Sequence, residues 1–237
     1  MNWSVPKMWE DGDVWILGGG PSVVKQFNIP DDVVQAVMAN TAPLSTYSPY
    51  MSVLHDKHVI GINVAYMIGD WIDMVFFGDE NWYKKNKEAL AVFPGIKVSC
   101  HVKTKEVPWI KYLGKDGRKA LGISDSPNMV GWNCNSGAAA ISVAANAGAK
   151  RIILLGFDMC KDGSNHKHWH NAYKKPENAP VRGHRTPRVA PLPFERHLKG
   201  FPAIARDAKR RGIEIINVCP TSAITVFPKC DLKDVLG

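Results

Sequence analysis

The residue types best suited to chemistry gather between positions 135 and 170. A small polar turn, Asn135–Gly137, opens an alanine-rich segment, and an apolar run at 151–155 ends just before Asp158. Turn, tightly packed helix and buried strand are the parts of an α/β protein, in which ligands bind at the carboxyl ends of the strands. Three histidines follow at alternate positions, His166, His168 and His170. We therefore expect the chemistry at this edge of a parallel sheet.

The alternating histidines admit two interpretations. Alternate side chains on a strand can share one metal ion, as in some zinc sites. The same segment carries several lysines, however, and no cysteine stands at ligand spacing. This favours histidines that bind phosphate or move protons over a zinc site.

A glycine turn follows an expected strand at 14–18. It consists of Gly18, Gly19, Gly20, Pro21 and Ser22. Glycines let the backbone approach a phosphate, and the N-terminus of a following helix favours anions. A dinucleotide fingerprint is not expected, because Val23 stands where the third glycine would be. A plain strand-to-helix turn is the alternative. On the nucleotide interpretation, Gly20→Val should block binding while leaving the fold mostly intact.

Other polar residues follow neighbouring strands. Asn63 ends an expected strand at 58–63 and would face the same crevice, although asparagine there is often only a turn residue. Asp79 and Glu80 follow a strand at 74–77. They suit acid–base work or a metal, or equally a helix N-cap and a first-turn acid. Thr221 and Ser222 follow the last expected strand and can contact a ligand or cap the next segment of the chain.

The order of elements predicts the fold. Apolar runs at 14–18, 58–63, 74–77, 96–100, 151–155 and 214–219 read as buried strands, and helical patterns lie between several of them. Strands alternating with helices favour an α/β, Rossmann-like, doubly wound and mostly parallel sheet. We expect one domain over 1–237. Segments 41–55 and 162–193 break the rhythm, and the second is long enough to suggest a mobile lid over the active site.

Composition narrows the classes of protein. The formal charge of +8 fits anionic substrates or nucleic acid, but no nucleic-acid-binding signature appears, so nucleic acid is possible and not favoured. No apolar run reaches membrane-spanning length, and no secretory apolar segment follows Met1. Five cysteines without a CxxC pair favour reduced thiols. These features predict a cytoplasmic protein.

In order, these segments resemble the bacterial sialyltransferases of glycosyltransferase family 42 and the related DUF115-type proteins. The glycine turn resembles the family's Gly-Asn-Gly-Pro-Ser, with Gly19 in place of the asparagine. Asn63 matches a strand-ending asparagine that contacts the nucleotide, and Gly78 stands where the family has another asparagine. Ser136-Gly137 resembles the Ser-Gly that opens a small-residue helix.

Further matches lie in the second half of the chain. Gly156-Phe157-Asp158 resembles the family's Gly-Ile-Asp, and Cys219–Ser222 resembles its Cys-Pro-Asn-Ser. Cys160 and His166 stand in place of two tyrosines near the donor phosphate. Gly183-His184 resembles the dipeptide that carries the general base.

The resemblance implies a glycosyltransferase that uses a nucleotide-activated sugar, with CMP as the best guess. His184 would deprotonate the acceptor hydroxyl in a direct displacement, with His170 and then His168 as the next candidates, and His166 would stabilise the leaving phosphate without a metal. The implied nucleotide-binding residues are Gly18, Gly19, Gly20, Pro21, Ser22, Asn63, Gly78, Asp79, Asn135, Ser136, Gly137, Asp158, Cys160, Thr221 and Ser222.

Two alternatives stay open. One is a diphosphotransferase of the DUF115 type, similar to a pterin pyrophosphokinase, which would use ATP and Mg²⁺ held at Asp79 or Asp158. The other is a non-catalytic protein that binds nucleotides or nucleic acid on the same scaffold. The sequence leaves the acceptor and the oligomeric state open.

Overall fold

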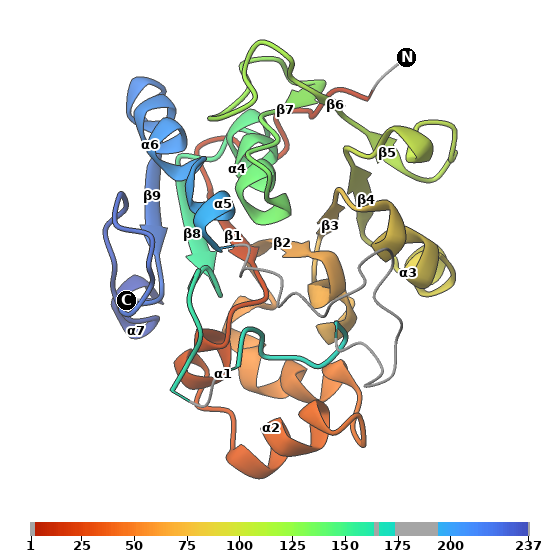
Figure 1. The fold of residues 1–237 in the computed structure, drawn as a ribbon, viewed down its shortest axis with the longest axis vertical. Coiled ribbons are helices and arrows are strands. Elements are labelled where there is room, and N and C mark those ends of the chain that lie inside the picture. The colour runs from red at the N-terminus through yellow and green to blue at the C-terminus, as the bar shows by residue number, and fades with distance from the viewer. Residues whose placement is uncertain (1–2, 164–165, 174–193, 237) are drawn as a thin grey trace, which may run out of the picture.

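The fold is built on one parallel sheet. The computed structural model describes residues 3–163, 166–173 and 194–236, and Figure 1 shows their arrangement. The seven strands run in the order β5-β4-β3-β2-β1-β8-β9, and every pairing is parallel. The strands are β1 (Asp13–Leu17), β2 (His58–Ile62), β3 (Met74–Phe77), β4 (Ile96–Ser99), β5 (Lys111–Tyr112), β8 (Arg151–Leu155) and β9 (Glu214–Asn217). The predicted Rossmann-like α/β fold is confirmed.

The strand order creates a switch point between β1 and β8. The chain moves outward from β1 through β2, β3 and β4 to β5, and then returns to place β8 and β9 on the other side. In the register of the sheet, Leu17 lies level with Gly61 and with Leu155, so the three central strands end together. In open α/β sheets this is where ligands bind, because the connecting loops diverge there.

Helices cover both faces of the sheet, as the apolar strands require. Successive residues of β1 enter different cores, since Val14 and Ile16 pack with the first cluster and Trp15 and Leu17 with the second. α4 (Ser136–Asn146) and α6 (Phe201–Arg210) contribute to the first. The second includes residues of α1 (Ser22–Gln26), α2 (Asp31–Met38), α3 (Glu80–Val92) and the 3₁₀-helices η1 (Leu44–Leu54) and η2 (Asn63–Ile68).

Helix α4 lies directly over the central strands. Its residues from Gly137 to Asn146 are all buried, and it contacts β1, β2, β3 and β8. Alanine, glycine and serine have short side chains, so the helix axis can approach the sheet closely. Gly148, at φ +102°, follows the helix in a conformation that favours glycine. The remaining elements are short: η3 (Val102–Thr104), β6 (Gly114–Lys115), β7 (Met129–Val130), α5 (Phe194–Leu198) and α7 (Lys233–Leu236).

Two segments break the alternation of strands and helices in the sequence. The segment at 41–55 is mostly η1, whose Tyr47, Met51 and Leu54 are buried in the second core. In the 162–193 segment, residues 164–165 and 174–193 lie outside the described residues, and the lid stays a prediction there. The described part does not behave as a loose loop, because Trp169 is 1% exposed and His170 3% exposed. Tyr47 donates a hydrogen bond from its hydroxyl to the Trp169 carbonyl at 3.2 Å.

Within the described ranges, none of the helices has the length and apolar character needed to cross a bilayer.

Candidate functional site

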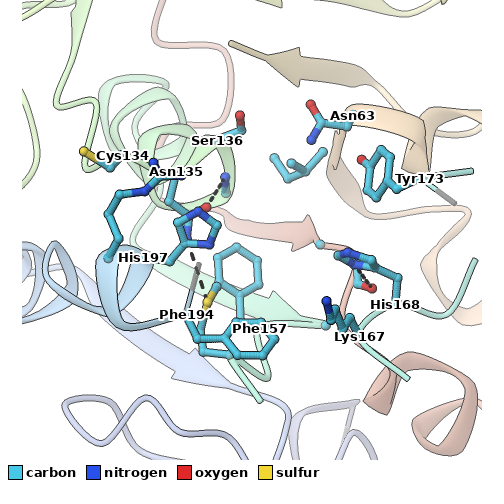
Figure 2. Close-up of a pocket in the computed structure, with 18 of the residues that line it drawn as sticks. Asn63, Cys134, Asn135, Ser136, Phe157, Lys167, His168, Tyr173, Phe194 and His197 are labelled. Carbon is cyan, nitrogen blue, oxygen red and sulfur yellow. Dashed lines mark hydrogen bonds between the residues drawn. The ribbon is translucent and has the colours of Figure 1, made fainter. Parts of the chain in front are cut away.

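A cavity of about 370 Å³ opens at the switch point of the sheet. This size lies within the range of about 300–1,000 Å³ that is usual for small-molecule sites. Figure 2 shows Asn63, Tyr173, Lys167 and His168 on one side and α4 with His197 and Phe194 on the other. The lining residues are Gly18, Gly19, Gly20, Ile62, Asn63, Asp79, Trp132, Cys134, Asn135, Ser136, Gly137, Gly156, Phe157, Met159, Cys160, Lys167, His168, Tyr173, Phe194, Arg196 and His197.

The cavity brings together many of the residues singled out in the sequence. Those that line it are Gly18, Gly19, Gly20, Asn63, Asp79, Asn135, Ser136, Gly137 and Cys160. Those that do not are Pro21, Ser22, Gly78, Asp158, His166, Thr221 and Ser222. His184 lies outside the described residues, so its role stays a prediction.

Asp158 holds the glycine turn from behind. Its Oδ1 accepts a hydrogen bond from the Ser22 amide at 2.8 Å, and its Oδ2 accepts one from the Ser22 hydroxyl at 2.9 Å. The carboxyl is 4% exposed, and burial raises its pKa. The anion at the start of α1 is therefore the protein's own Asp158, which stabilises the turn that shapes the cavity.

Gly20 is required by this contact with Asp158. A Cβ at position 20 would lie 1.9 Å from Asp158 Oδ2 and 2.6 Å from the Gly156 carbonyl oxygen. The expectation that Gly20→Val leaves the fold mostly intact is therefore wrong. The sequence could not show the overlap, because Gly20 and Asp158 meet only in the folded chain.

Three other candidates do not line the cavity, and two of them support residues that do. A Cβ at Gly78 would lie 2.4 Å from the Trp132 ring, so this glycine makes room for an aromatic side chain that lines the cavity. Ser222 donates from its hydroxyl to the Phe157 carbonyl at 2.7 Å. Thr221 lies beside a second hollow, together with Ser22.

The N-terminus of α4 opens into the cavity. Asn135 caps the helix, because its Oδ1 accepts hydrogen bonds from the amides of Gly137 at 2.9 Å and Ala138 at 3.3 Å. Ser136, the first helical residue, lines the cavity beside its cap. The positive end of the helix dipole therefore faces the site and favours a negatively charged ligand.

Several backbone positions around the cavity are conformationally uncommon. Asn63, Cys134 and Met159 line it with φ values of 53°, 53° and 51°. Non-glycine residues in the left-handed region cost free energy and gather at binding sites. The Asn63 Oδ1 is buried and has no hydrogen-bond partner among the described residues. The Tyr173 hydroxyl faces the Asn63 side chain, and burial raises the pKa of Tyr173 to about 12.

The acidic pair after β3 serves the start of α3. Asp79 Oδ1 accepts a hydrogen bond from the Trp82 amide at 2.7 Å, which makes Asp79 the N-cap. Glu80 contacts the ammonium groups of Lys103 at 2.6 Å and Lys84 at 2.7 Å, and these hydrogen bonds lower its pKa to about 2. Of the two interpretations left open, the structure shows the N-cap and the first-turn acid.

Asp79 and Asp158, the residues suggested for Mg²⁺, are both hydrogen-bonded within the protein. Asp158 already receives two hydrogen bonds from Ser22, and Asp79 is engaged by Trp82. Within residues 3–163, 166–173 and 194–236, no three histidine, cysteine, aspartate or glutamate side chains form a group that could hold a metal ion. Mg²⁺ is often held by one or two carboxylates together with substrate phosphates, so the Mg²⁺ of the diphosphotransferase alternative stays a prediction at these positions.

The histidines occupy different environments. His166 is exposed and turns toward Asp162, which accepts a hydrogen bond from its amide at 2.7 Å. His168 lines the cavity, whereas His170 is buried and burial lowers its pKa to about 3. His197, on α5, lines the cavity as well, and burial lowers its pKa.

Sequence reasoning missed part of the lining. Among the missed residues are Trp132, Lys167, Tyr173, Arg196 and His197. No local pattern marks α5, which follows the expected lid and comes to the cavity only through the tertiary fold. Lys167 carried a weak signal, because it stands between two of the alternating histidines.

Solved structures with the same fold include glycosyltransferases. The MAf glycosyltransferase of Magnetospirillum magneticum matches 97% of this chain with a TM-score of 0.55 and 12% identity, and the match covers 35% of that longer protein. A sialyltransferase CST-II variant, solved in complex with CMP, matches 92% of this chain and 86% of its own with a TM-score of 0.50 and 17% identity. The chain thus spans about a third of the MAf protein. No family model and no curated protein matches the sequence. At these identities the likeness shows the fold.

Proposed function

We propose that the protein is a transferase that binds a nucleotide-activated sugar, with CMP as the nucleotide, and transfers the sugar to a hydroxyl acceptor. The observation that carries the proposal is the charge of the cavity at the switch point. Lys167 and Arg196 line it together with the positive end of α4, and the one carboxylate among the described lining residues, Asp79, is engaged as a helix cap. Such a cavity suits an anion of the size of a nucleotide.

The proposed reaction is a direct displacement. The acceptor hydroxyl forms a bond to the anomeric carbon, while the bond from that carbon to the phosphate oxygen breaks and its electron pair leaves with the nucleotide. A histidine takes the hydroxyl proton. The resemblance assigns this base to His184, which remains a prediction outside the described residues.

The leaving phosphate needs positive charge. The resemblance assigned this task to His166, which turns toward Asp162 and does not line the cavity. We propose Lys167 and Arg196 for it, because both are cationic side chains that line the cavity. Protein cations would then supply the stabilisation in this mechanism.

The resemblance in the sequence and the shared fold both support this proposal. Residues 18–20, 63 and 135–137 converge on one cavity, although they are far apart in the chain. The solved CST-II variant has CMP bound on a similar fold. These observations support a nucleotide donor.

Calorimetric titration with CMP, UDP and ATP, each with and without Mg²⁺, tests the proposal. We expect CMP to bind with no need for Mg²⁺. Binding of ATP that depends on Mg²⁺ would support the diphosphotransferase instead, and tight DNA binding without nucleotide binding would support the non-catalytic alternative.

A matched pair of variants locates the binding. Arg196→Gln removes a cation from the cavity, whereas Arg206→Gln removes one from the exposed side of α6. A hydrogen bond to a charged group contributes about 1.5–3 kcal/mol, so Arg196→Gln should weaken CMP binding by about tenfold or more. Arg206→Gln should leave the affinity unchanged. Equal effects of the two changes would show that only the overall charge matters.

A further inference from the structure

His168 is held in one protonation form by the glycine turn. Its Nδ1 lies 3.2 Å from the Gly19 carbonyl oxygen. A carbonyl oxygen only accepts hydrogen bonds, so Nδ1 must carry the proton and donate it. In the neutral ring this leaves a lone pair on Nε2, for which the described residues supply no hydrogen-bond partner. The ring also lines the cavity, as Figure 2 shows.

The surroundings keep the ring in place. His170 stacks on it with centroids 5.2 Å apart and 12° between the planes, and Tyr173 meets it edge-on at 5.0 Å. Trp169, between the two histidines, donates from its amide to the same Gly19 carbonyl at 3.2 Å and from Nε1 to the Gly18 carbonyl at 2.8 Å. The histidine segment and the glycine turn therefore form one packed unit.

The absence of a side chain at Gly19 makes room for this ring. A Cβ there would lie 3.1 Å from His168 Nδ1 and 3.5 Å from His170 Nε2. Gly19 also stands where the family resemblance places an asparagine. Glycine in place of asparagine is explained by geometry, because His168 and His170 occupy the space beside the turn that an asparagine side chain would need.

The two stacked rings are not equivalent. The Ala172 amide donates to His170 Nδ1 at 3.3 Å, so the proton of the neutral His170 ring lies on Nε2. His170 is 3% exposed and its pKa is lowered to about 3, so it stays neutral. His168 has the opposite tautomer and reaches the cavity. It is therefore the member of the pair that can exchange a proton with a ligand.

The glycine turn itself offers a place for a phosphate beside this ring. The Gly18 and Gly20 amides donate to the Leu155 and Gly156 carbonyls, whereas the Gly19 amide donates to no described residue. The free amide belongs to the same residue whose carbonyl holds His168. A phosphate bound at the Gly19 amide would lie close to the imidazole.

We propose that His168 becomes an imidazolium when the nucleotide binds and donates its Nε2–H to the phosphate that leaves. The inference rests on the proposed function and adds a leaving-group residue to it. In the transfer step the bond between the anomeric carbon and the phosphate oxygen breaks, and the electron pair goes to the phosphate. His168 keeps its proton and balances one negative charge of the product nucleotide.

No neighbouring group described around His168 is a free anion that could stabilise its protonated form, so the ligand must supply the negative charge. Lys167, His170, Tyr173 and His197 surround the ring, and none of them is an anion near neutral pH. Burial lowers the pKa of His168, and Lys167 lowers it further. Asp79, across the same cavity, is engaged by the Trp82 amide. The free protein therefore holds His168 neutral, and a phosphate raises its pKa.

The affinity for the nucleotide should fall as pH rises. The bound state holds the proton more tightly than the free state, so nucleotide binding takes up a proton at pH values between the two pKa values of His168. Affinity is full below the pKa of the free protein and falls by about tenfold per pH unit until the pKa of the complex is passed. Net uptake should approach one proton per nucleotide in this interval.

Calorimetry with CMP, in buffers of different ionisation enthalpy near pH 7, measures this proton uptake. Wild type should take up a proton, and His168→Gln should take up none, because an amide can donate a hydrogen bond but cannot carry the charge. His58→Gln, at the amino end of β2, should retain the uptake of wild type.

Nitrogen NMR of the wild-type histidines gives a readout that needs neither a variant nor a donor sugar. The proton of neutral His168 should reside on Nδ1 and that of His170 on Nε2. A His168 ring protonated on Nε2 in the free protein would overturn the inference. CMP binding without proton uptake would also overturn it while leaving the proposed function intact, whereas failure to bind CMP would overturn both.

Discussion

The same substitution at the neighbouring glycines Gly19 and Gly20 should affect different properties, ligand binding at Gly19 and stability at Gly20. Gly20→Ala places a Cβ 1.9 Å from Asp158 Oδ2, so the carboxyl must move away from Ser22. Gly19→Ala places a Cβ 3.1 Å from His168 Nδ1, where the imidazole must give way by a few tenths of an ångström. The first change breaks the support of the turn, and the second displaces one ring on its surface.

The magnitudes follow from these contacts. Asp158 accepts two hydrogen bonds in a buried place, and a hydrogen bond to a charged group contributes about 1.5–3 kcal/mol, so losing both should cost about 3 kcal/mol or more. Total stability is about 5–15 kcal/mol, so Gly20→Ala should remove a large part of it. With a urea m-value of about 3 kcal/mol/M, the midpoint should fall by about 1 M or more. Gly19→Ala should shift it by a few tenths of that amount, while weakening CMP binding through the displaced His168.

Urea unfolding followed by fluorescence, together with CMP titration of both variants, checks this contrast. A Gly20→Ala protein with the wild-type midpoint would refute the role assigned to Asp158. A Gly19→Ala protein that loses as much stability as Gly20→Ala would show that the glycines are needed for the turn alone.

Three further outcomes are expected from the described contacts. Asn135→Ala removes the cap of α4 and should lower the free energy of unfolding by about 1 kcal/mol, as measured by urea unfolding; no change would mean that the cap contributes nothing. Cys134, exposed at the cavity, should react with N-ethylmaleimide far faster than buried Cys100, as peptide mass spectrometry can measure. CMP should slow the reaction of Cys134. A Cys134 that reacts at the same rate with and without bound CMP would place the nucleotide elsewhere. Glu80→Gln should reduce the free energy of unfolding near neutral pH. The difference from wild type should vanish as pH falls from about 4.5 to about 2, because the pKa of Glu80 is lower in the folded than in the unfolded protein. A difference that does not change with pH would exclude the ion pairs as its cause.

The fold was predictable because its signals are local. Apolar runs such as 151–155 are buried on both faces of a parallel sheet, and a short continuous run is what such strands require. The small-residue stretch from Ser136 likewise indicated a helix packed closely on the sheet. The segment at 41–55 showed no helix or strand pattern in the sequence, whereas its Tyr47, Met51 and Leu54 anchor a 3₁₀-helix in the core.

The position of the site in the fold was predictable from the sequence, whereas several of the residues that line it were not. Residues that end strands, such as Asn63, come to the cavity because the strand ends meet there. Asp158 also follows a strand, but it faces Ser22, because the direction of a side chain after a strand depends on the next turn of backbone. Arg196 and His197 depend on where α5 docks, and nothing local in the sequence specifies that position.

The most direct test of the central claim is a crystal structure of the protein with CMP. The account predicts that the nucleotide lies between the glycine turn and the N-terminus of α4, with its phosphate within hydrogen-bond distance of His168 Nε2 and near Arg196. A nucleotide bound at the hollow beside Ser22 and Thr221, or anywhere else outside the cavity, would contradict it.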